Sequence, residues 1–218
     1  MALNTISKHV SDVLTHVKRQ FGDESGAQII DEDIIRWLND GQREVNSIAK
    51  VIEAKATTPV VANQYEYDLP ADAANDITAV LVGGHPIPGT SFADYNQNVA
   101  SNDPARTNIN TPQIWSRWGK TITFWPTPGP GDAEKLFTIY YIGSPVDVSD
   151  SSDLLSIPDS YYEPLIMYIM SKAYELDEDY EASQNMREQM RIRLSEEDGR
   201  GDGGQDQFYP SITITDFY

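Results

Sequence analysis

The segment from Ile157 to Leu194 constrains the fold most, because it has the spacing of two consecutive helices. Ile157-Pro158-Asp159 opens the first helix, since proline fits a first helical turn, where the N–H that it lacks would have no partner anyway. Apolar residues then recur at helical steps: Tyr161, Tyr162, Leu165, Ile166, Ile169, Met170, Ala173 and Tyr174. After the acidic turn Asp177-Glu178-Asp179, a second apolar series follows: Tyr180, Ala182, Met186, Met190 and Leu194. The segment therefore predicts a helical hairpin.

Two more helices are predicted near the N-terminus. Residues 4–20 form an amphipathic helix, capped by Asn4 or Thr5 and ended by Gly22, with one apolar face: Ile6, Val10, Leu14 and Val17. A second helix runs from Asp31 to about Ala54, with Ile34, Trp37, Leu38, Val45 and Ile48 on its apolar face. Gly41 lies inside this helix, where it costs about 1 kcal/mol relative to alanine, so we expect a kink or a close contact there.

The stretch from Thr57 to Gly143 has the composition of strands and turns. β-Branched and aromatic runs alternate with clusters of Gly, Pro, Asn and Asp, and predict strands at residues 64–69, 77–82, 113–118, 121–125 and 136–142. Gly119-Lys120 joins two of these strands as a tight hairpin. The polar stretch 90–110 is irregular, with a short helix near Phe92–Tyr95.

The order of these elements predicts an α+β fold in which the N- and C-terminal helices form one bundle and the strands form an inserted antiparallel β lobe. The expected parts are the N-terminal helices at 1–56, the β lobe at 57–145, the helical hairpin at 146–195, and a flexible acidic linker with an apolar tail at 196–218. The tail residues alternate as in a strand and are candidates for partner binding: Phe208, Tyr209, Ile212, Ile214, Phe217 and Tyr218. A disordered tail, or a strand that folds back on its own β lobe, remain open alternatives.

The composition excludes several classes of function. A net charge of −18 argues against a surface that grips nucleic acid or an anionic membrane, since both need a basic patch. The chain has no cysteine, which excludes disulfides and thiolate chemistry and suits a protein made in a reducing cytosol. It has no signal peptide at its N-terminus and no apolar run long enough to span a membrane, so we expect a soluble protein.

No motif predicts an enzyme, a metal site or a cofactor. Gly119-Lys120-Thr121 imitates the end of a phosphate-binding loop, but Ile114 occupies the position of the required glycine, and a strand follows instead of a helix. The acidic runs at 147–153 and 198–206 lack the ordered spacing and terminal Glu of a calcium loop. The three histidines, His9, His16 and His85, are too scattered for a metal centre.

Several segments, taken in order, resemble the head-to-tail adaptor (connector or head-completion) proteins of tailed bacteriophages. The likeness spans about residues 30–195. It rests on six pieces in order: the helix with Asp40-Gly41-Gln42-Arg43-Glu44-Val45-Asn46, the strand Tyr65-Glu66-Tyr67-Asp68-Leu69-Pro70, the next strand with Ile77, Val80 and Gly83-Gly84, the strand and turn Ile122-Thr123-Phe124-Trp125-Pro126-Thr127-Pro128, the strand with Tyr140-Tyr141, and the hairpin opened by Ile157-Pro158. Each piece alone is common, and their order makes the match specific. The first helix and the Gly/Asp-rich tail fall outside it.

The resemblance implies a structural virion protein at the junction of neck and tail, made in the host cytoplasm. Copies of the chain would form a ring, twelve-fold like the portal that it binds, and extend the DNA channel toward the next tail component, a nozzle or tail terminator. DNA would pass through without specific binding, and carboxylates facing the channel would help it slide. The resemblance also implies that terminal segments, here the apolar tail, reach the portal or the next tail component.

The alternative from a different class is a virion-associated module that binds or hydrolyses carbohydrate. Trp115, Trp118 and Trp125 would form its sugar-stacking platform, with nearby carboxylates for acid–base chemistry. Against this reading, Trp115 and Trp118 are an odd number of residues apart and so point to opposite faces of a regular strand.

Overall fold

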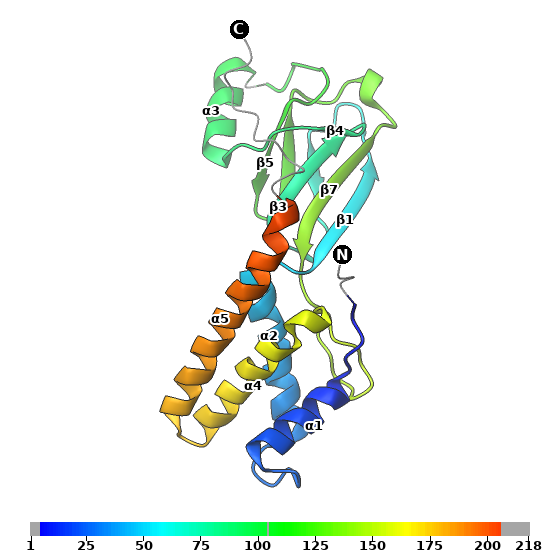
Figure 1. Ribbon diagram of the computed structural model, residues 1–218. Helices are drawn as coiled ribbons and strands as arrows, with labels where there is room; N and C mark the ends of the chain where they lie inside the picture. The colour runs from blue at the N-terminus through cyan, green and yellow to red at the C-terminus, as the bar shows by residue number, and fades with distance from the viewer. Residues whose placement is uncertain (1–4, 104, 206–218) are drawn as a thin grey trace. The chain divides into compact units, whose positions relative to one another are not determined.

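The computed structural model describes residues 5–103 and 105–205 (Figure 1). Within these residues the chain has five α-helices, two short 3₁₀ turns and two antiparallel sheets, which confirms the α+β class. It divides into two compact units. The helical unit comprises the residues up to Ile52 and those from Pro145 onward, and the β unit comprises Glu53–Ser144. Each is described by itself below.

The helical unit contains four α-helices: α1 (Val10–Phe21), α2 (Asp31–Ala49), α4 (Tyr162–Leu176) and α5 (Tyr180–Gln205). Pro158 precedes the 3₁₀ turn η2 (Asp159–Tyr161), which leads directly into α4. Helices α4 and α5 lie side by side in antiparallel directions, joined by a short turn (Figure 1). The hairpin predicted from Ile157 onward is therefore present.

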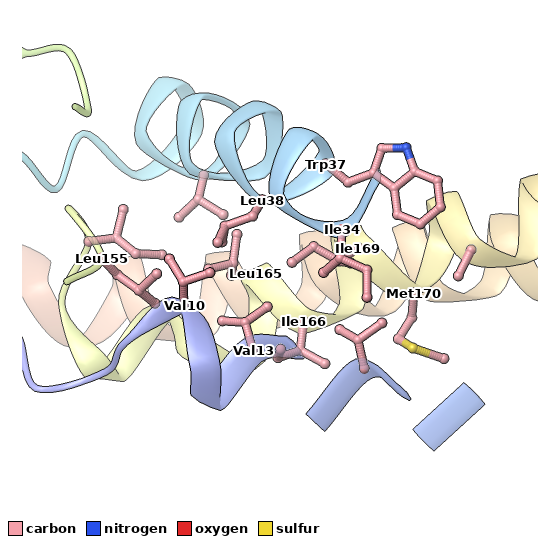
Figure 2. Close-up of a cluster of buried hydrophobic side chains, with 14 of the residues drawn as sticks. Val10, Val13, Ile34, Trp37, Leu38, Leu155, Leu165, Ile166, Ile169 and Met170 are labelled. Atoms are coloured by element: carbon pink, nitrogen blue, oxygen red, sulfur yellow. The ribbon is translucent and has the colours of Figure 1, made fainter. Parts of the chain in front are cut away.

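All four helices contribute side chains to one buried apolar cluster. Figure 2 shows its centre, where Val10 and Val13 of α1, Ile34 and Leu38 of α2, and Leu165 and Ile169 of α4 converge. Met190 and Leu194 complete the cluster from α5, and Leu155 and Ile157 from the loop before α4. Most of these side chains are completely buried. Removal of this apolar surface from water is the main stabilisation of the helical unit.

Gly41 of α2 faces side chains of α4. A Cβ atom at this position would lie 2.8 Å from Cδ1 of Leu165 and 2.9 Å from Cδ1 of Tyr168. The close contact expected from the sequence is therefore present, and glycine is required for packing.

Three helix boundaries differ from the sequence expectation. Helix α1 begins at Val10 and not at residue 4, because Thr5 to His9 run extended and bond the loop before α4: Leu155 N–H donates to Lys8 O (3.0 Å) and Asp159 N–H to Thr5 O (2.9 Å). Helix α2 ends at Ala49, where Lys50 turns into the left-handed region (φ 51°). Helix α5 continues to Gln205, where a flexible linker was expected from residue 196. An apolar pattern reports burial, and its loss after Leu194 does not exclude a helical backbone there.

The β unit has a four-stranded and a three-stranded sheet. The first has the order β1 (Glu53–Pro59), β7 (Leu136–Gly143), β3 (Ala73–Val82), β4 (His85–Pro86). The second has the order β2 (Glu66–Asp68), β6 (Thr121–Trp125), β5 (Ile114–Trp118). The predicted strands are all present, and β1 is an addition. Helix α3 (Phe92–Asn102) extends the short helix expected near residue 92, and η1 (Pro130–Asp132) lies before β7.

The inner faces of the two sheets share a core rich in aromatic residues. Phe124 and Phe137 meet edge to face with ring centroids 4.6 Å apart, and Tyr67 contacts both rings. Val80, Val82, Ile122 and Ile139 belong to the same buried cluster. The Tyr-x-Leu-Pro strand of the sequence thus serves the core, since Tyr67 and Leu69 are both buried.

Candidate interaction surfaces

The six residues predicted to bind a partner lie outside the described residues: Phe208, Tyr209, Ile212, Ile214, Phe217 and Tyr218. Among the residues that are described, each unit has a surface on which exposed apolar side chains lie beside charge. These are the turn between α4 and α5 and the tip of the β5–β6 hairpin.

The first surface is the turn between α4 and α5. Leu176, the last residue of α4, is 54% exposed, and Tyr180, the first of α5, is 63% exposed. The turn between them is fixed by hydrogen bonds, because Asp179 N–H donates to Tyr174 O (2.9 Å) and Ala182 N–H donates to Asp179 Oδ1 (3.0 Å). The exposed apolar pair is therefore presented on a rigid turn.

The charge of this turn is negative. Asp177, Glu178 and Glu181 are all exposed. The neighbouring cations are engaged by Glu175, which accepts hydrogen bonds from Lys172 Nζ (2.8 Å) and Arg187 Nη2 (2.9 Å). The hydrogen bond from Lys172 is the main cause that lowers the pKa of Glu175. We call Leu176, Asp177, Glu178, Tyr180 and Glu181 the acidic corner.

The second surface is the tip of the β5–β6 hairpin. Gly119 and Lys120 form the predicted two-residue turn, with Trp118 paired to Thr121 and Gly119 in the left-handed region (φ 59°). The Trp118 side chain is 64% exposed, and its ring stacks on Phe92 with centroids 4.4 Å apart and planes inclined by 27°. We call Phe92, Arg117, Trp118 and Lys120 the aromatic tip.

Helix α3 holds Phe92 in place against the hairpin. Ser91 caps the helix, accepting a hydrogen bond from Asp94 N–H (3.1 Å). One turn later, the completely buried Tyr95 donates its hydroxyl hydrogen to Phe124 O of β6 (2.8 Å). The stack of Phe92 on Trp118 therefore rests on a helix that is fixed to the same sheet.

A half-buried arginine and a buried aspartate hold the segment after α3. The Arg106 guanidinium lies 4.7 Å from the centroid of the Tyr65 ring and donates a hydrogen bond to Tyr95 Oη. Asp103 is buried and accepts hydrogen bonds from the N–H groups of Thr107 (2.6 Å) and Asn108 (2.7 Å). Burial alone would raise the pKa of Asp103, but these hydrogen bonds outweigh it and lower the pKa. The guanidinium of Arg106 and the carboxylate of Asp103 therefore hold the loop after α3 in place.

The three tryptophans of the β unit do not form one platform. Trp115 pairs with Phe124, whereas Trp118 and Trp125 belong to pairs on the opposite face of the β5–β6 ribbon. Trp115 donates its indole N–H to Ile87 O (3.1 Å) and packs where a Cβ atom on Gly89 would lie. The predicted opposition of Trp115 and Trp118 is confirmed, and a sugar-stacking surface made of all three rings is not present.

The helix segment that carries part of the family resemblance anchors the loop before α4. Asn39 exchanges two hydrogen bonds with the backbone of Val148, both 2.9 Å. The buried Gln42 accepts from Ser156 N–H through Oε1 (2.6 Å). The buried Asn46 accepts from Ile52 N–H (3.0 Å). The polar residues of α2 therefore fix loops.

The acidic loop before α4 is organised by its own backbone. Asp153 accepts from the N–H groups of Ser149 and Asp150, both at 2.9 Å, and the pKa of Asp153 is lowered, mainly by the Ser149 hydrogen bond. Across the part of the chain that the structure describes, no three His, Asp or Glu residues are grouped so that they could hold a metal ion. No helix of the described ranges has the length and apolar character needed to cross a membrane.

The negative charge is concentrated outside the β unit. Residues 53–144 contain nine of the 34 Asp and Glu residues and five of the 16 Lys and Arg residues. The remaining residues, 1–52 and 145–218, carry the other 25 acidic and 11 basic residues. Two of the five cations of the β unit, Arg117 and Lys120, lie at the aromatic tip.

Comparison with known families identifies one match. A family model described as SU10 adaptor protein matches residues 9–210 and so includes both units. No individually curated protein matches the chain.

Proposed function

This chain belongs to the family of SU10 adaptor proteins, and we propose that it forms a ring that joins the portal of a tailed phage to its tail and extends the DNA channel. The observation that carries the proposal is the length of the family match, which covers almost the whole chain. Family membership makes the chain a phage adaptor and a virion component, and it favours a structural role over an enzymatic one.

The helical unit is suited to ring formation. We propose that α1, α2, α4 and α5 form the bundle that packs side by side with copies of itself, twelve-fold like the portal. The support is the common core of these helices and the close contact at Gly41, which hold the helices together. A ring needs two different complementary surfaces on each copy, so that a head-to-tail contact can close.

The concentration of carboxylates outside the β unit supports the proposed channel role. Carboxylates that face a channel repel phosphates, so DNA slides past them without binding. We propose that the apolar end of the segment 196–218 contacts the portal or the next tail component through six residues, which lie outside the described ranges: Phe208, Tyr209, Ile212, Ile214, Phe217 and Tyr218. Residues 53–144 then form a lobe of the ring subunit.

The test is assembly on a portal. The full chain is mixed with the portal protein of the same virus, and the mass of the complex is measured and imaged by negative stain. We expect the portal ring to gain a second ring with the same number of copies. If the chain neither binds the portal nor occurs in purified virions, the proposed function is wrong.

A truncated chain that ends at Asp206 tests the tail separately. We expect it to bind the portal or the next tail component more weakly than the full chain, because it lacks the apolar alternation. Unchanged assembly of portal, adaptor and tail component would remove the docking role of the tail and leave the ring role intact.

A further inference from the structure

We propose that residues 211–216 of one copy add as an antiparallel strand to the open edge of β1 in the next copy of the ring. The inference rests on the proposed ring and refines the proposed role of the C-terminal segment. Ile212 and Ile214 bind the neighbouring adaptor, and the aromatic residues remain for the portal or the next tail component: Phe208, Tyr209, Phe217 and Tyr218.

Strand β1 presents backbone hydrogen-bonding groups along the edge of its sheet. It is the first strand in the order β1-β7-β3-β4, so it has a neighbour on one side only (Figure 1). Val60 N–H donates to Lys135 O (2.8 Å), and the direction of these groups alternates from one residue to the next. The N–H and C=O groups of Lys55 and Thr57 therefore point away from β7. Both residues are exposed, and within residues 5–103 and 105–205 no hydrogen bond reaches these groups.

β1 is the longest open edge in the described part of the β unit. It has seven residues, whereas β4 and β2, which also end their sheets, have two and three. The outer side of β5 is covered, because Trp115 N–H donates to Pro88 O (3.1 Å) and Trp115 O accepts from Thr90 N–H (2.9 Å). Proteins usually shorten or cover a sheet edge, and an edge left open takes up extended segments through backbone hydrogen bonds.

The chain itself carries a segment suited to this edge. Residues 211–215 read Ser-Ile-Thr-Ile-Thr, and such a β-branched alternation favours a strand. The preceding element is α5, so the segment has no hairpin partner before it. Residues 206–210 can span about 20 Å when extended, which lets the segment reach a neighbouring copy.

Charge selects this segment and sets its register. Lys55 lies near the middle of β1, with its ammonium group 5.5 Å from the centroid of the Tyr140 ring. A charge on a sheet edge disfavours pairing with an unmatched strand, whereas opposite charges on directly opposed residues stabilise the pair. Asp216 is the only charged residue among residues 207–218. The matched register therefore places Asp216 opposite Lys55.

This register agrees with the positions of the prolines. It places Ile214 opposite Thr57 and Ile212 opposite Pro59. Thr57 and Ile214 then exchange two backbone hydrogen bonds, because the outward groups of Thr57 meet those of Ile214. Pro59 has no N–H for Ile212, and Pro210 lies one pair further on, so the ladder ends where both strands have a proline.

The same register joins apolar side chains. Pro59 pairs with Leu136 of β7, whose side chain is 53% exposed, so the two form an apolar end of this face of the sheet. Residues directly opposite each other share a face, so Ile212 lies beside Pro59 and extends this end. The removal of apolar surface from water adds to the backbone hydrogen bonds.

Strand exchange also gives the kind of contact that a ring requires. The β1 edge and residues 211–216 are different surfaces, so each copy donates one strand and receives one. Such a head-to-tail contact is heterologous, and its repetition around an axis closes a ring.

Disulfide trapping tests the pairing, because the natural chain has no cysteine. Full-length Thr57→Cys protein is mixed with full-length Ile214→Cys protein and the portal, then oxidised. Paired Cα atoms lie about 5.5 Å apart, a distance that a disulfide spans. Each protein has one cysteine, so the mixed disulfide, identified by peptide mass, forms only between copies. We expect it in the assembled complex. Thr215→Cys is the matched control for Ile214→Cys, since its side chain points to the opposite face, and should give about tenfold less.

Proline substitutions in the segment test the backbone hydrogen bonds. Ile214→Pro removes the N–H that donates to Thr57 O and should weaken assembly on the portal about tenfold. Thr213→Pro is the matched control, because the N–H of residue 213 points away from β1, and its effect should stay below about threefold.

Charge exchange provides a measurement on the β unit itself. Lys55→Glu places a like charge opposite Asp216 and should weaken assembly on the portal about three- to tenfold. Adding Asp216→Lys should restore part of the loss, which a mere folding defect would not allow.

The outcomes separate this contact from the proposed function. Normal rings without the mixed disulfide, in which Ile214→Pro is as harmless as Thr213→Pro, would reject strand exchange and leave the adaptor role standing. A disulfide found only within single chains that carry both Thr57→Cys and Ile214→Cys would also reject it, because the segment would then fold back on its own β unit. Loss of portal binding in Ile214→Pro without the mixed disulfide would assign the segment to the portal alone. A mixed disulfide in a chain that never binds a portal would reject only the adaptor role.

Discussion

Replacement of Gly41 by alanine should destabilise the helical unit, although the same change stabilises most helix interiors. On propensity alone, alanine gains about 1 kcal/mol over glycine within a helix. Here the added Cβ atom would lie 2.8 Å from Leu165 Cδ1 and 2.9 Å from Tyr168 Cδ1. Leu165 is completely buried, so its methyl group cannot withdraw without displacing other core side chains. Overpacking costs about 1–3 kcal/mol, which leaves a net loss of up to about 2 kcal/mol.

Because the net effect of Gly41→Ala is small, its coupling to Leu165 is the decisive quantity. Leu165→Ala alone should cost about 2–5 kcal/mol. In that background the contact with Leu165 is gone and the contact with Tyr168 Cδ1 (2.9 Å) remains, so Gly41→Ala should cost less than it does in the natural chain. The two changes should therefore be coupled by about 0.5–3 kcal/mol.

The assay is urea unfolding of the four proteins in this cycle, followed by far-ultraviolet circular dichroism, which reports mainly the helices. Equal slopes of the free energy against urea would show that the four proteins unfold in the same manner. If Gly41→Ala stabilises the protein in both backgrounds, or if the two changes are additive, the close contact between α2 and α4 is not as described.

Three further predictions concern buried or capping polar groups. The pKa of Asp23 is lowered from 3.8 to about 2, mainly by the hydrogen bond from Ile29 N–H, so its stabilisation is complete above about pH 4 and lost as the pH falls toward 2. Asp23→Asn should therefore lower the free energy of unfolding at neutral pH and make it fall less as the pH drops from about 4 to about 2. Urea unfolding at several pH values measures this, and an unchanged fall in acid would contradict the prediction. Asn39→Ala removes both hydrogen bonds to Val148 and should speed proteolysis within the loop before α4; an unchanged digestion pattern would show that other contacts suffice. Tyr95→Phe leaves a buried carbonyl without its hydroxyl donor and should cost about 1–3 kcal/mol in denaturant unfolding, and a neutral effect would mean that water replaces the hydroxyl.

The sequence predicted those elements whose burial follows a regular period. The stripe from Tyr161 to Tyr174 and the hairpin at Gly119-Lys120 could be located because helical spacing and turn chemistry are local properties. Strand β1 (Glu53–Pro59) escaped prediction because its residues are mostly exposed and polar, and its pairing with β7 depends on residues far along the chain. The start of α1 was placed too early for the same reason, since Thr5 to His9 bond residues near 155.

The candidate surfaces were less predictable than the fold. The sequence placed Trp118 on the opposite face from Trp115, which is confirmed, but could not show that Phe92 stacks on it. That contact joins α3 to β5 across the loop between them, so local spacing does not reveal it. The acidic turn at residues 177–179 was visible as a run of like charge, whereas the exposure of Leu176 depends on where α4 meets its neighbours. Periodicity identifies the buried face of a helix, but exposure at its end depends on tertiary packing.

The pairing of β1 with β7 has a consequence for how such a chain can change over time. Glu53 and Ile142 are direct partners, so the backbone enters and leaves the β unit at neighbouring points, about 5 Å apart. A segment that begins and ends at neighbouring points can be replaced as a unit. Recombination at those points would exchange residues 53–144 for a foreign lobe, or for a short turn, while the chain on either side keeps its own core. Such an exchange would give a phage adaptor a different β unit and leave the helical unit unchanged.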